Sequence, residues 1–394
     1  MVFRKLIVFL LVVALGGSAK AQQVTYAEAD SITYAQYISE NWKDLKATGE
    51  QVLKQGIDFP YLRLRIAYAN FMEGNYSAAL TQYNQILKND SFNETARLYS
   101  YWCNRNLNRD DEASYHASRL KDSLLVSSGA KPFGVLQAGI ETSYKMPDDV
   151  LRNPGLYNRL HVSNRLFMKL KLEQAVSYYM QQLRIRSTPN RGKGNSTLLN
   201  NQQLEYYGKI SYPVSSSIIL MGAYHYLNNN FGGTIYQNHI GLGGLRYSKP
   251  FYEFQADVNL SSITGVNVSQ FNTAITVYPK GNFNLYTISR LSIQNQNAAN
   301  QIIFTQVAGS KLAKLLWLEA NVTVGKLNNY LDADAIYVYN SIDATLFKTG
   351  ATAFVPLKSA LLLHLNYGYE QKENAFELTT YNQHSITGGF TWKF

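Results

Sequence analysis

Two histidines, His225 and His239, are the residues whose type and placement could support catalysis. They fall on neighbouring predicted strands beside a predicted loop at 228–234, where a histidine could activate a serine for lipid hydrolysis or acyl transfer. Such a pair requires hydrogen-bond contact and a third group that orients the histidine. No motif supplies that group, and the six histidines show no metal-ligand spacing. We therefore expect structural histidines, no enzyme activity, no cofactor and no metal site.

Charged side chains on the polar faces of the predicted strands form a second candidate group. If the apolar faces meet lipid, the polar faces point into a lumen. Early strands would place basic residues inside: Arg159, Arg165, Lys169, Lys171, Arg184, Arg186 and Lys209. Later strands would place acidic residues inside: Glu253, Asp257, Glu319, Asp343 and Glu370.

Two interpretations of this separation of charge remain open. In a water-filled pore, a positive wall facing a negative wall would orient dipolar solutes. In a filled lumen, the same charges would pair across the barrel, because buried charges must be paired or solvated. The bulky residues predicted on the same face favour a filled or narrow lumen; they are Phe167, Tyr207, Trp317 and Phe347.

The elements that must position these residues are strands with a two-residue period, which begins at Phe133. Segments such as 159–170, 316–324 and 361–370 alternate apolar and polar residues over ten to fifteen positions. Soluble sheets usually have strands of about five or six residues, whereas a tilted strand that crosses a bilayer needs about ten. The segments number about fourteen, and bacterial outer-membrane barrels have an even number of strands.

Turns of unequal length separate the predicted strands, as in outer-membrane barrels with short periplasmic turns and long external loops. Short connections are expected near 171–172, 213–214, 248–250, 279–281, 311–313 and 357–359. Long polar connections are expected at 146–156, 188–199, 228–234, 262–268, 294–299, 327–339 and 372–381. This alternation places both ends of the barrel in the periplasm, together with the helical segment that precedes it.

The two ends of the sequence carry export signals. Residues 1–21 contain a short basic segment, an apolar run of about ten residues and the small-residue pattern Ala19-Lys20-Ala21, which together predict a cleaved signal peptide. At the other end, Phe390, Trp392 and Phe394 fall on one face of a strand that ends the chain. This pattern resembles the signal that the barrel assembly machinery reads in outer-membrane barrels.

Composition agrees with a barrel in the outer membrane. Aromatic residues make up 13% of the chain, and charged residues only 16% against about 25% in soluble domains. The net charge is +10, which suits anionic lipid head groups or an anionic solute, and export makes nucleic acid an improbable partner. The single cysteine, Cys103, excludes an intramolecular disulfide.

The region before residue 130 has a helical period. Residues Ile66, Ala67, Gly74, Tyr76, Ala79, Tyr83 and Ile86 match the packing positions of a tetratricopeptide repeat, and Ala113 follows Ala79 by the 34 residues of that repeat. We expect about two repeats, preceded by one helix over 36–55 that ends before Pro60. Either the repeats form a concave surface for a protein or peptide partner, or they form a plug or collar packed under the barrel.

The complete layout therefore predicts an α+β multidomain chain: a signal peptide (1–21), a periplasmic tetratricopeptide-like domain (22–130) and an antiparallel transmembrane β-barrel of about fourteen strands (131–394). The segments 41–45 and 56–67 resemble the front of YaiO-type outer-membrane proteins, which join repeats to a barrel of comparable size. That resemblance implies outer-membrane localisation but no defined activity. A more distant likeness is to exopolysaccharide export porins.

Three functions remain possible at this stage. The first is an interaction protein whose repeats dock a periplasmic partner or support an envelope assembly. The second is a narrow porin or export channel for polar or anionic solutes such as polysaccharide. The third, ranked last, is a lipid-modifying enzyme that uses His225 and His239.

Overall fold

The computed structural model describes residues 24–186, 196–358 and 360–394. The predicted signal peptide (1–21) and most of the predicted connection 188–199 lie outside these residues. The chain divides into two compact units, one ending at Glu73 and the other spanning Gly74–Phe394. The predicted helical segment 22–130 is therefore shared between the two units.

The first unit contains three helices: α2 (Tyr26–Ile38), α3 (Trp42–Lys54) and α4 (Pro60–Met72). Ala29, Val52 and Leu62 are fully buried where the three helices meet. The single helix predicted over 36–55 is wrong, because a break at 39–41 separates α2 from α3. Glu40 there has a positive φ of 55°, and the Asn41 side chain caps α3.

Helix α3 ends before Pro60, as expected, and Pro60 begins the next helix. It occupies the first turn of α4, where its missing N–H leaves no hydrogen bond unmade.

The second unit begins with four helices: α5 (Tyr76–Asn89), α6 (Glu94–Asn106), α7 (Asp110–Ala117) and α8 (Asp122–Ser128). Together with the first unit they show a regular spacing. Helices α2, α4 and α6 begin at residues 26, 60 and 94, and helices α3, α5 and α7 begin at 42, 76 and 110. Each set is spaced by 34 residues, so the described helices form three pairs, one more than the sequence analysis expected.

The predicted repeat-packing residues occupy consistent places in these pairs. Ala67, Ala79, Tyr83 and Ala113 are buried, and Tyr76 is partly exposed at the start of α5. Gly74 has a φ of 74° in the turn before α5, and Glu40 and Asn108 have positive φ at the equivalent turns. Among the described residues, no helix is both long and apolar enough to cross a membrane.

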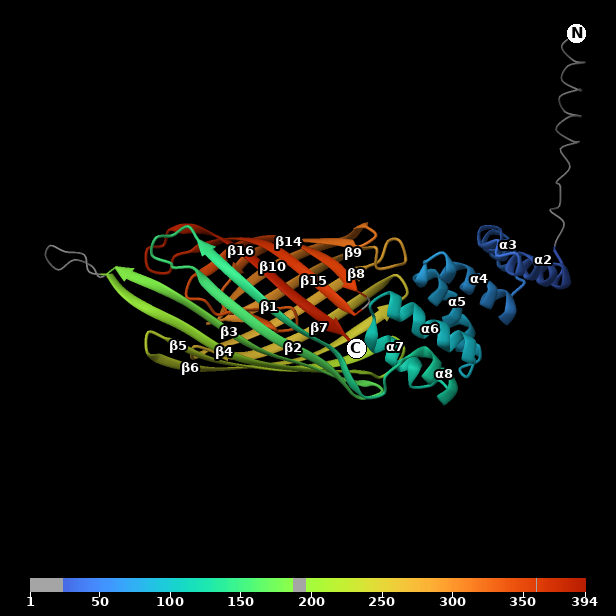
Figure 1. Ribbon diagram of the computed structural model, residues 1–394, viewed down its shortest axis with the longest axis horizontal. Coiled ribbons are helices and arrows are strands. Elements are labelled where there is room, and N and C mark those ends of the chain that lie inside the picture. Colours follow the sequence, from blue (N-terminus) through green and yellow to red (C-terminus); the bar gives the residue numbers. More distant parts are fainter. Residues whose placement is uncertain (1–23, 187–195, 359) are drawn as a thin grey trace, which may run out of the picture. The chain divides into compact units, whose positions relative to one another are not determined.

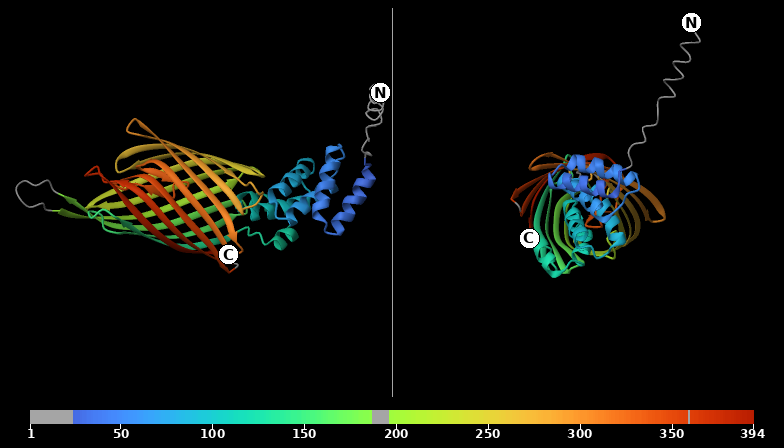
Figure 2. Two further views of the ribbon diagram at one scale, coloured as in Figure 1. Left: turned by 90° about the horizontal axis from the view of Figure 1, so that it is seen from above. Right: turned by 90° about the vertical axis from the view of Figure 1, so that its right-hand side faces the viewer.

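A closed antiparallel barrel of fourteen strands follows the helices in the described residues, with consecutive strands as neighbours around the wall (Figures 1 and 2). The predicted fold class is thereby confirmed. The wall strands are β1 (Gly134–Pro147), β2 (Gly155–Phe167), β3 (Leu170–Arg186), β4 (Ser196–Pro213), β5 (Ile218–Phe231), β6 (Thr234–Lys249), β7 (Tyr252–Ile263), β8 (Val266–Val277), β9 (Leu285–Gln296), β10 (Ala299–Ala313), β11 (Leu316–Leu327), β14 (Ala344–Lys358), β15 (Leu361–Glu373) and β16 (Thr380–Lys393).

The wall closes where the last strand pairs with the first. Ile140 of β1 pairs with Phe390 of β16, and Ala138 pairs with Trp392. In the described strands, closure leaves no unpaired edge, as a sheet in hydrocarbon requires. Phe390, Trp392 and Phe394 are all exposed, as are many large apolar side chains of the other strands. The outer surface of the wall is therefore apolar, and the lumenal surface is polar.

The connections differ from the predicted alternation of short and long. At the end of the barrel away from helices α5–α8, β5–β6, β7–β8 and β9–β10 are joined by two-residue turns at 232–233, 264–265 and 297–298. Both residues of each turn have positive φ, the geometry that continues the twist of a hairpin. The prediction of long loops at 228–234, 262–268 and 294–299 was wrong, because most of the polar residues there belong to the paired strands. Longer connections are found at 148–154, 328–343 and 374–379.

The other end of the barrel, called here the turn end, contacts helix α5 through the connection 278–284. The Gly281 carbonyl accepts a hydrogen bond from the backbone N–H of Ser77 (2.9 Å), and Asn282 Nδ2 donates to the Gly74 carbonyl (3.0 Å). Gly281 has a φ of 64°, and a Cβ there would lie 2.0 Å from Asn75 Oδ1. Only glycine allows this close approach.

At the opposite end, called here the loop end, a buried ion pair joins two connections. Arg152 Nε and Nη2 donate to the two carboxylate oxygens of Asp343 at 2.6 and 2.9 Å. The same carboxylate accepts from the Tyr381 hydroxyl and from the Ala375 backbone N–H. One carboxylate thus holds four segments of the loop end together.

We predict that Asp343→Asn destabilises the protein by about 3–5 kcal/mol, because Arg152 would be left buried without its charge partner. Urea unfolding in detergent micelles, followed by tryptophan fluorescence, measures this change. Lys326→Ala serves as the control, since it breaks the more exposed Lys326–Glu373 pair and should cost less than about 1 kcal/mol. Equal losses in the two variants would contradict the assignment.

Candidate functional site: the occluded lumen

The connection between β11 and β14 folds into the lumen. Residues 328–343 form a small hairpin of β12 (Tyr330–Asp332) and β13 (Tyr337–Tyr339), called here the lumenal hairpin. Leu331 and Ala335 are buried against Leu227, Ile240 and Ile263 of the wall. A connection with this much apolar surface is stable only where the wall covers it.

Polar contacts fix the tip of the lumenal hairpin at four points of the wall. Lys209 Nζ lies 2.7 Å from Asp334 Oδ2, and Arg290 Nη1 lies 2.6 Å from Asp332 Oδ1. His225 Nδ1 lies 2.7 Å from the Ala335 carbonyl oxygen, and Gln270 bonds both the N–H and the carbonyl of Leu331. The hairpin is thus tied to strands β4, β5, β8 and β9.

Helix α7 reaches the lumen from the turn end, and its first residues depart from the repeat pattern. In α3 and α5 the preceding residue is an asparagine, Asn41 or Asn75, whose side chain caps the helix. The equivalent residue before α7 is Arg109, which makes no side-chain cap. Arg109 instead forms an ion pair with Glu253 of β7, and its guanidinium lies 4.6 Å from the centre of the Tyr278 ring.

The next residues of α7 bring two buried carboxylates into the same region. Asp111 accepts hydrogen bonds from Ser211 Oγ (2.9 Å) and from Arg246 Nη2 (3.0 Å). Glu112 accepts from Ser248 Oγ and lies 3.4 Å from Arg246 Nε. Acidic residues in the first turn also suit the positive end of the helix dipole, which partly replaces the missing cap.

The charge environment keeps Asp111 ionised. Burial would raise the pKa of its carboxyl, but Lys171 and Arg246 more than offset this and hold the pKa well below its usual value.

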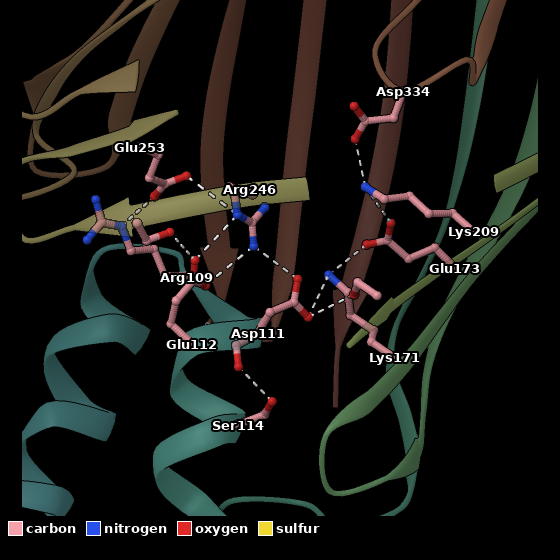
Figure 3. Close-up of polar contacts among 12 residues, drawn as sticks. Arg109, Asp111, Glu112, Ser114, Lys171, Glu173, Lys209, Arg246, Glu253 and Asp334 are labelled. Carbon is pink, nitrogen blue, oxygen red and sulfur yellow. Dashed lines mark hydrogen bonds and ion pairs between the residues drawn. The ribbon is translucent and has the colours of Figure 1, made fainter. Parts of the chain in front are cut away.

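A continuous series of charged contacts joins helix α7 to the lumenal hairpin (Figure 3). Lys171 Nζ lies 3.7 Å from Asp111 Oδ1 and 3.0 Å from Glu173 Oε1. Lys209 Nζ then lies 3.6 Å from Glu173 Oε2 and 2.7 Å from Asp334. These contacts, together with those of Arg109, Glu112, Arg246 and Glu253, are called here the charge ladder.

The described residues of the lumen enclose a larger and a smaller cavity, and the smaller one lies beside the charge ladder. The larger, about 620 Å³, lies against the lumenal hairpin and the strands on either side of the β1–β16 closure. The smaller, about 300 Å³, is lined by Arg109, Arg246, Glu253 and Asp334. Ile288, Arg290 and Glu319 line both cavities, so the two spaces adjoin along strands β9 and β11. The lumen therefore has internal space that helix α7 and the hairpin interrupt.

Most of the predicted lumen residues face inward. Buried or partly buried positions on the lumenal face are held by Arg159, Arg165, Lys209, Glu253, Asp257, Glu319 and Glu370. Asp343 is buried too, but in the connection before β14 rather than on the wall. Tyr207 also points inward, and its hydroxyl donates to the Asp334 carbonyl.

Five predicted lumen residues are misplaced. Arg184 and Arg186 share the outward face of β3 with Val176, because side chains two residues apart fall on one face. Lys169 lies in the β2–β3 turn, where its ammonium is 4.5 Å from the centre of the Tyr212 ring. Two aromatic residues were also wrong: Phe167 is exposed at the end of β2, and Phe347 pairs with the outward-facing Val324.

The predicted separation of charge into two walls is also wrong. Among the early strands, Arg159 pairs with Glu141, and Lys171 pairs with Glu173. The later strands contribute inward-facing basic residues as well; these are Arg246, Arg290 and Lys348. Charges pair with near neighbours and with inserted segments, because a buried ion pair requires direct contact.

The residues that sequence reasoning missed belong to the inserted segments. The lumenal hairpin was expected to be an external loop, although Tyr330, Leu331, Tyr337, Val338 and Tyr339 make it unusually apolar for one. The run Asp110-Asp111-Glu112 followed an arginine where the earlier pairs have asparagine. Both features can be seen in the sequence, but neither indicates which residues of the barrel wall these segments contact.

The two candidate catalytic histidines point to opposite faces of the wall. His225 is buried in the lumen, where its Nε2 lies 3.3 Å from Glu205 Oε2. His239 lies on the outward side, where its Nδ1 contacts the Tyr224 hydroxyl at 2.7 Å. The two histidines therefore do not lie together at one site, as the last-ranked alternative, a lipid-modifying enzyme, would require.

Neither a protein-family model nor a curated protein sequence matches the chain. Solved barrels resemble it at low identity. The Pseudomonas putida toluene transporter TodX is 9% identical and has a TM-score of 0.46, over 68% of this chain and 92% of its own. Omp33 of Acinetobacter baumannii is 9% identical with a TM-score of 0.41, over 66% and 99%.

Helix α7 also carries a buried histidine that makes its packing depend on pH. Burial, reinforced by Arg97 and Arg119, lowers the pKa of His116 to about 3 from an ordinary value of 6.5. Between pH 3 and pH 6.5, His116 would bind a proton in the unfolded chain but not in the folded helix. Stability contributed by this site is therefore complete above pH 6.5 and falls as the pH decreases toward 3.

We predict that the melting temperature of the helical signal at 222 nm decreases between pH 6.5 and pH 4 and that His116→Gln reduces this decrease. Circular dichroism of the full chain in detergent measures it. His239→Gln is the control, because that side chain lies on the outer surface and should leave the slope unchanged. An unaltered slope in His116→Gln would refute the assignment.

Proposed function

We propose that this protein is an outer-membrane channel for polar solutes, described here in its closed state. The observation that carries the proposal is the charge ladder: a helix from one end and a hairpin from the other block a polar lumen and are held by ion pairs. A polar lumen with internal cavities is suited to solute passage, and an apolar outer wall is suited to lipid.

The many charged contacts that hold helix α7 and the lumenal hairpin favour a movable gate over a permanent plug in the lumen. Placing charges in a low-dielectric interior costs desolvation free energy, and well-packed apolar residues of similar volume often stabilise a protein equally well. A permanent plug therefore has no need of so many charged contacts. Ion pairs between separate segments can be exchanged for water or solute charges, so that α7 can move away from the wall.

The localisation follows from the same proposal. Helices α5–α8 lie at the turn end, whereas the longest described connection, 328–343, starts from the loop end, and the longer connections of bacterial barrels lie on the external side. A signal peptide over 1–21 and recognition of β16 by the assembly machinery are part of the proposal. The three helix pairs with a 34-residue spacing support the assignment of tetratricopeptide-like repeats, and repeats followed by a barrel support a YaiO-like architecture. The proposal assigns no covalent chemistry to the protein.

We predict that the double variant Asp111→Asn/Glu112→Gln opens the channel. Without these charges, Arg246 and Lys171 lose their partners on α7, and the helix should leave the lumen more often. Planar-bilayer recordings should show rare, small openings for the wild-type protein and at least about tenfold higher mean conductance for the variant, a change equivalent to about 1.4 kcal/mol in the gating equilibrium.

Asp110→Asn provides the matched control. Asp110 is the neighbouring acidic residue on α7, but it is more exposed and pairs with Arg105 of α6 instead of the barrel wall. Its conductance should equal that of the wild type. A silent double variant that is still correctly folded, or a wild-type channel that is permanently open, would refute the gate.

Protein docking by the first unit is a second candidate function. Helices α2–α4 have their own core but expose several large apolar side chains: Tyr26, Tyr34, Ile38, Tyr61 and Met72. We propose that these side chains contact a periplasmic protein partner, as tetratricopeptide-like repeats commonly bind peptides or proteins.

A photo-crosslinking amino acid at Tyr61 of the full-length protein in cells tests this docking. It should give one discrete adduct, whereas the same substitution at the exposed residue Glu50 should not. Equal crosslinking at both positions would argue against a defined surface.

A further inference from the structure

The larger lumenal cavity has the chemistry of a binding site for a neutral sugar. We propose that it binds a neutral, hydroxyl-rich solute of about the size of a disaccharide, and this proposal rests on the channel function proposed above. The cavity volume of about 620 Å³ lies within the range of about 300–1,000 Å³ that is common for small-molecule sites.

The charges around the cavity are balanced in number. Its lining contains five acidic residues, Glu141, Glu205, Glu319, Asp332 and Glu370, and five basic residues, Lys145, Arg159, Arg290, Lys348 and Lys372. Arg290 and Lys348 both contact Asp332 at 2.6 and 3.8 Å. A net-neutral wall gives a charged solute little advantage, because attraction to residues of one sign is offset by repulsion from residues of the other sign.

Glu141 is the centre of the best-defined part of the cavity wall. Its carboxylate accepts a hydrogen bond from Arg159 Nη2 at 3.0 Å and from the Tyr337 hydroxyl at 3.4 Å, and it lies 3.3 Å from His364 Nε2. These partners come from β2, the lumenal hairpin and β15. The site is therefore built jointly by the wall and the inserted hairpin.

Two glycines make room for the imidazoles of this cluster. A Cβ at Gly139 would lie 2.4 Å from Cε1 of His161, and a Cβ at Gly389 would lie 2.3 Å from Cε1 of His364. Real Cβ atoms do not approach carbon atoms so closely, so any larger residue would force the rings away. The backbone on both sides of the closure is thus shaped to hold the two histidines at the cavity wall.

Hydrogen-bonding capacity remains unused at this wall. Arg159 is only 8% exposed, yet its Nε and Nη1 atoms have no hydrogen-bond partner among the described residues. The same holds for His161 Nδ1 and for Asn201 Oδ1. Buried polar atoms normally have partners, and each unsatisfied one requires an explanation.

A hydroxyl-rich neutral solute satisfies these atoms. Sugar hydroxyls both donate and accept, so they can accept from Arg159 and donate to Asn201 within one molecule. The rest of the lining offers further amide and hydroxyl groups, among them Gln203, Asn321, Asn366 and Thr352. Tyr157 and Tyr179 add ring surface, since their hydroxyls are already bonded to Ser177 and Gln181.

Maltose is the probe for the test, with maltobionate as its anionic counterpart. Saturation-transfer NMR and titration calorimetry on the full-length protein in lauryldimethylamine oxide avoid a sugar-based detergent. We expect saturable binding of maltose to the closed wild-type protein and binding of maltobionate that is several-fold weaker. Equal or stronger binding of maltobionate, or no binding of maltose, would overturn the proposal.

Two variants locate the site. Asn201→Ala and Arg159→Lys should each weaken maltose binding by about tenfold, since each removes hydrogen-bonding groups offered to the solute. Arg165→Lys is the matched control, because Arg165 is a buried inward arginine of the same strand that does not line the cavity. Heat-modifiable gel migration checks that each variant is folded. Unchanged affinity in the Asn201 variant and the Arg159 variant would overturn the site.

The outcome is separable from that of the channel proposal. Maltose binding is measured on the closed protein, whereas gating is measured by the conductance of the α7 variants. Maltose binding with the expected variant effects supports this site even if the α7 variants remain silent. Absence of binding in a protein whose α7 variants conduct overturns the sugar site alone.

Discussion

The structure depends on one guanidinium. Arg246 projects from β6 into the lumen and contacts Asp111, Glu112 and Glu253. An arginine in a protein does not lose its proton, and this side chain is only 20% exposed, so nearby carboxylates must balance its charge. Two of those carboxylates come from helix α7 and one from the wall. The requirement to neutralise Arg246 therefore determines where the helix sits, and the position of the helix determines that the lumen is blocked at this end.

The same rule accounts for the lumenal hairpin. The inward face of a closed barrel is polar because alternate residues must face away from lipid. In a narrow barrel these polar groups cannot all reach bulk water. Segment 328–343 supplies partners for Lys209, Arg290 and His225, and it adds apolar contacts where the wall exposes Leu227 and Ile240. The wall and its insertion are complementary in both charge and polarity.

Sequence reasoning predicted the parts of the fold that periodicity determines. Two-residue alternation indicated the barrel, its strand number and the inward side of Arg159, Glu253 and Glu370. The prediction failed at Arg184 and Arg186, which were placed in the lumen because they are charged. Both residues lie an even number of positions from the outward-facing Val176, so their side chains share its outward face. Sequence reasoning also failed for the charge ladder, because the contact between Asp111 and Arg246 joins residues 135 positions apart and no local pattern reports such a contact.

The boundary between the two compact units does not coincide with a boundary of the 34-residue repeat. The 34-residue spacing would keep α4 and α5 together as one helix pair, yet the units separate between Glu73 and Gly74. Helix α5 belongs with the barrel because connection 278–284 bonds its first turn, and α7 belongs there because Arg109 and Asp111 bond the lumenal wall. These contacts with the barrel agree with the placement of α5 and α7 in the second unit. If α7 moves as proposed, its ion pairs in the lumen break while α5 keeps its backbone hydrogen bond to connection 278–284, so α6 and the connections on either side of it absorb the motion.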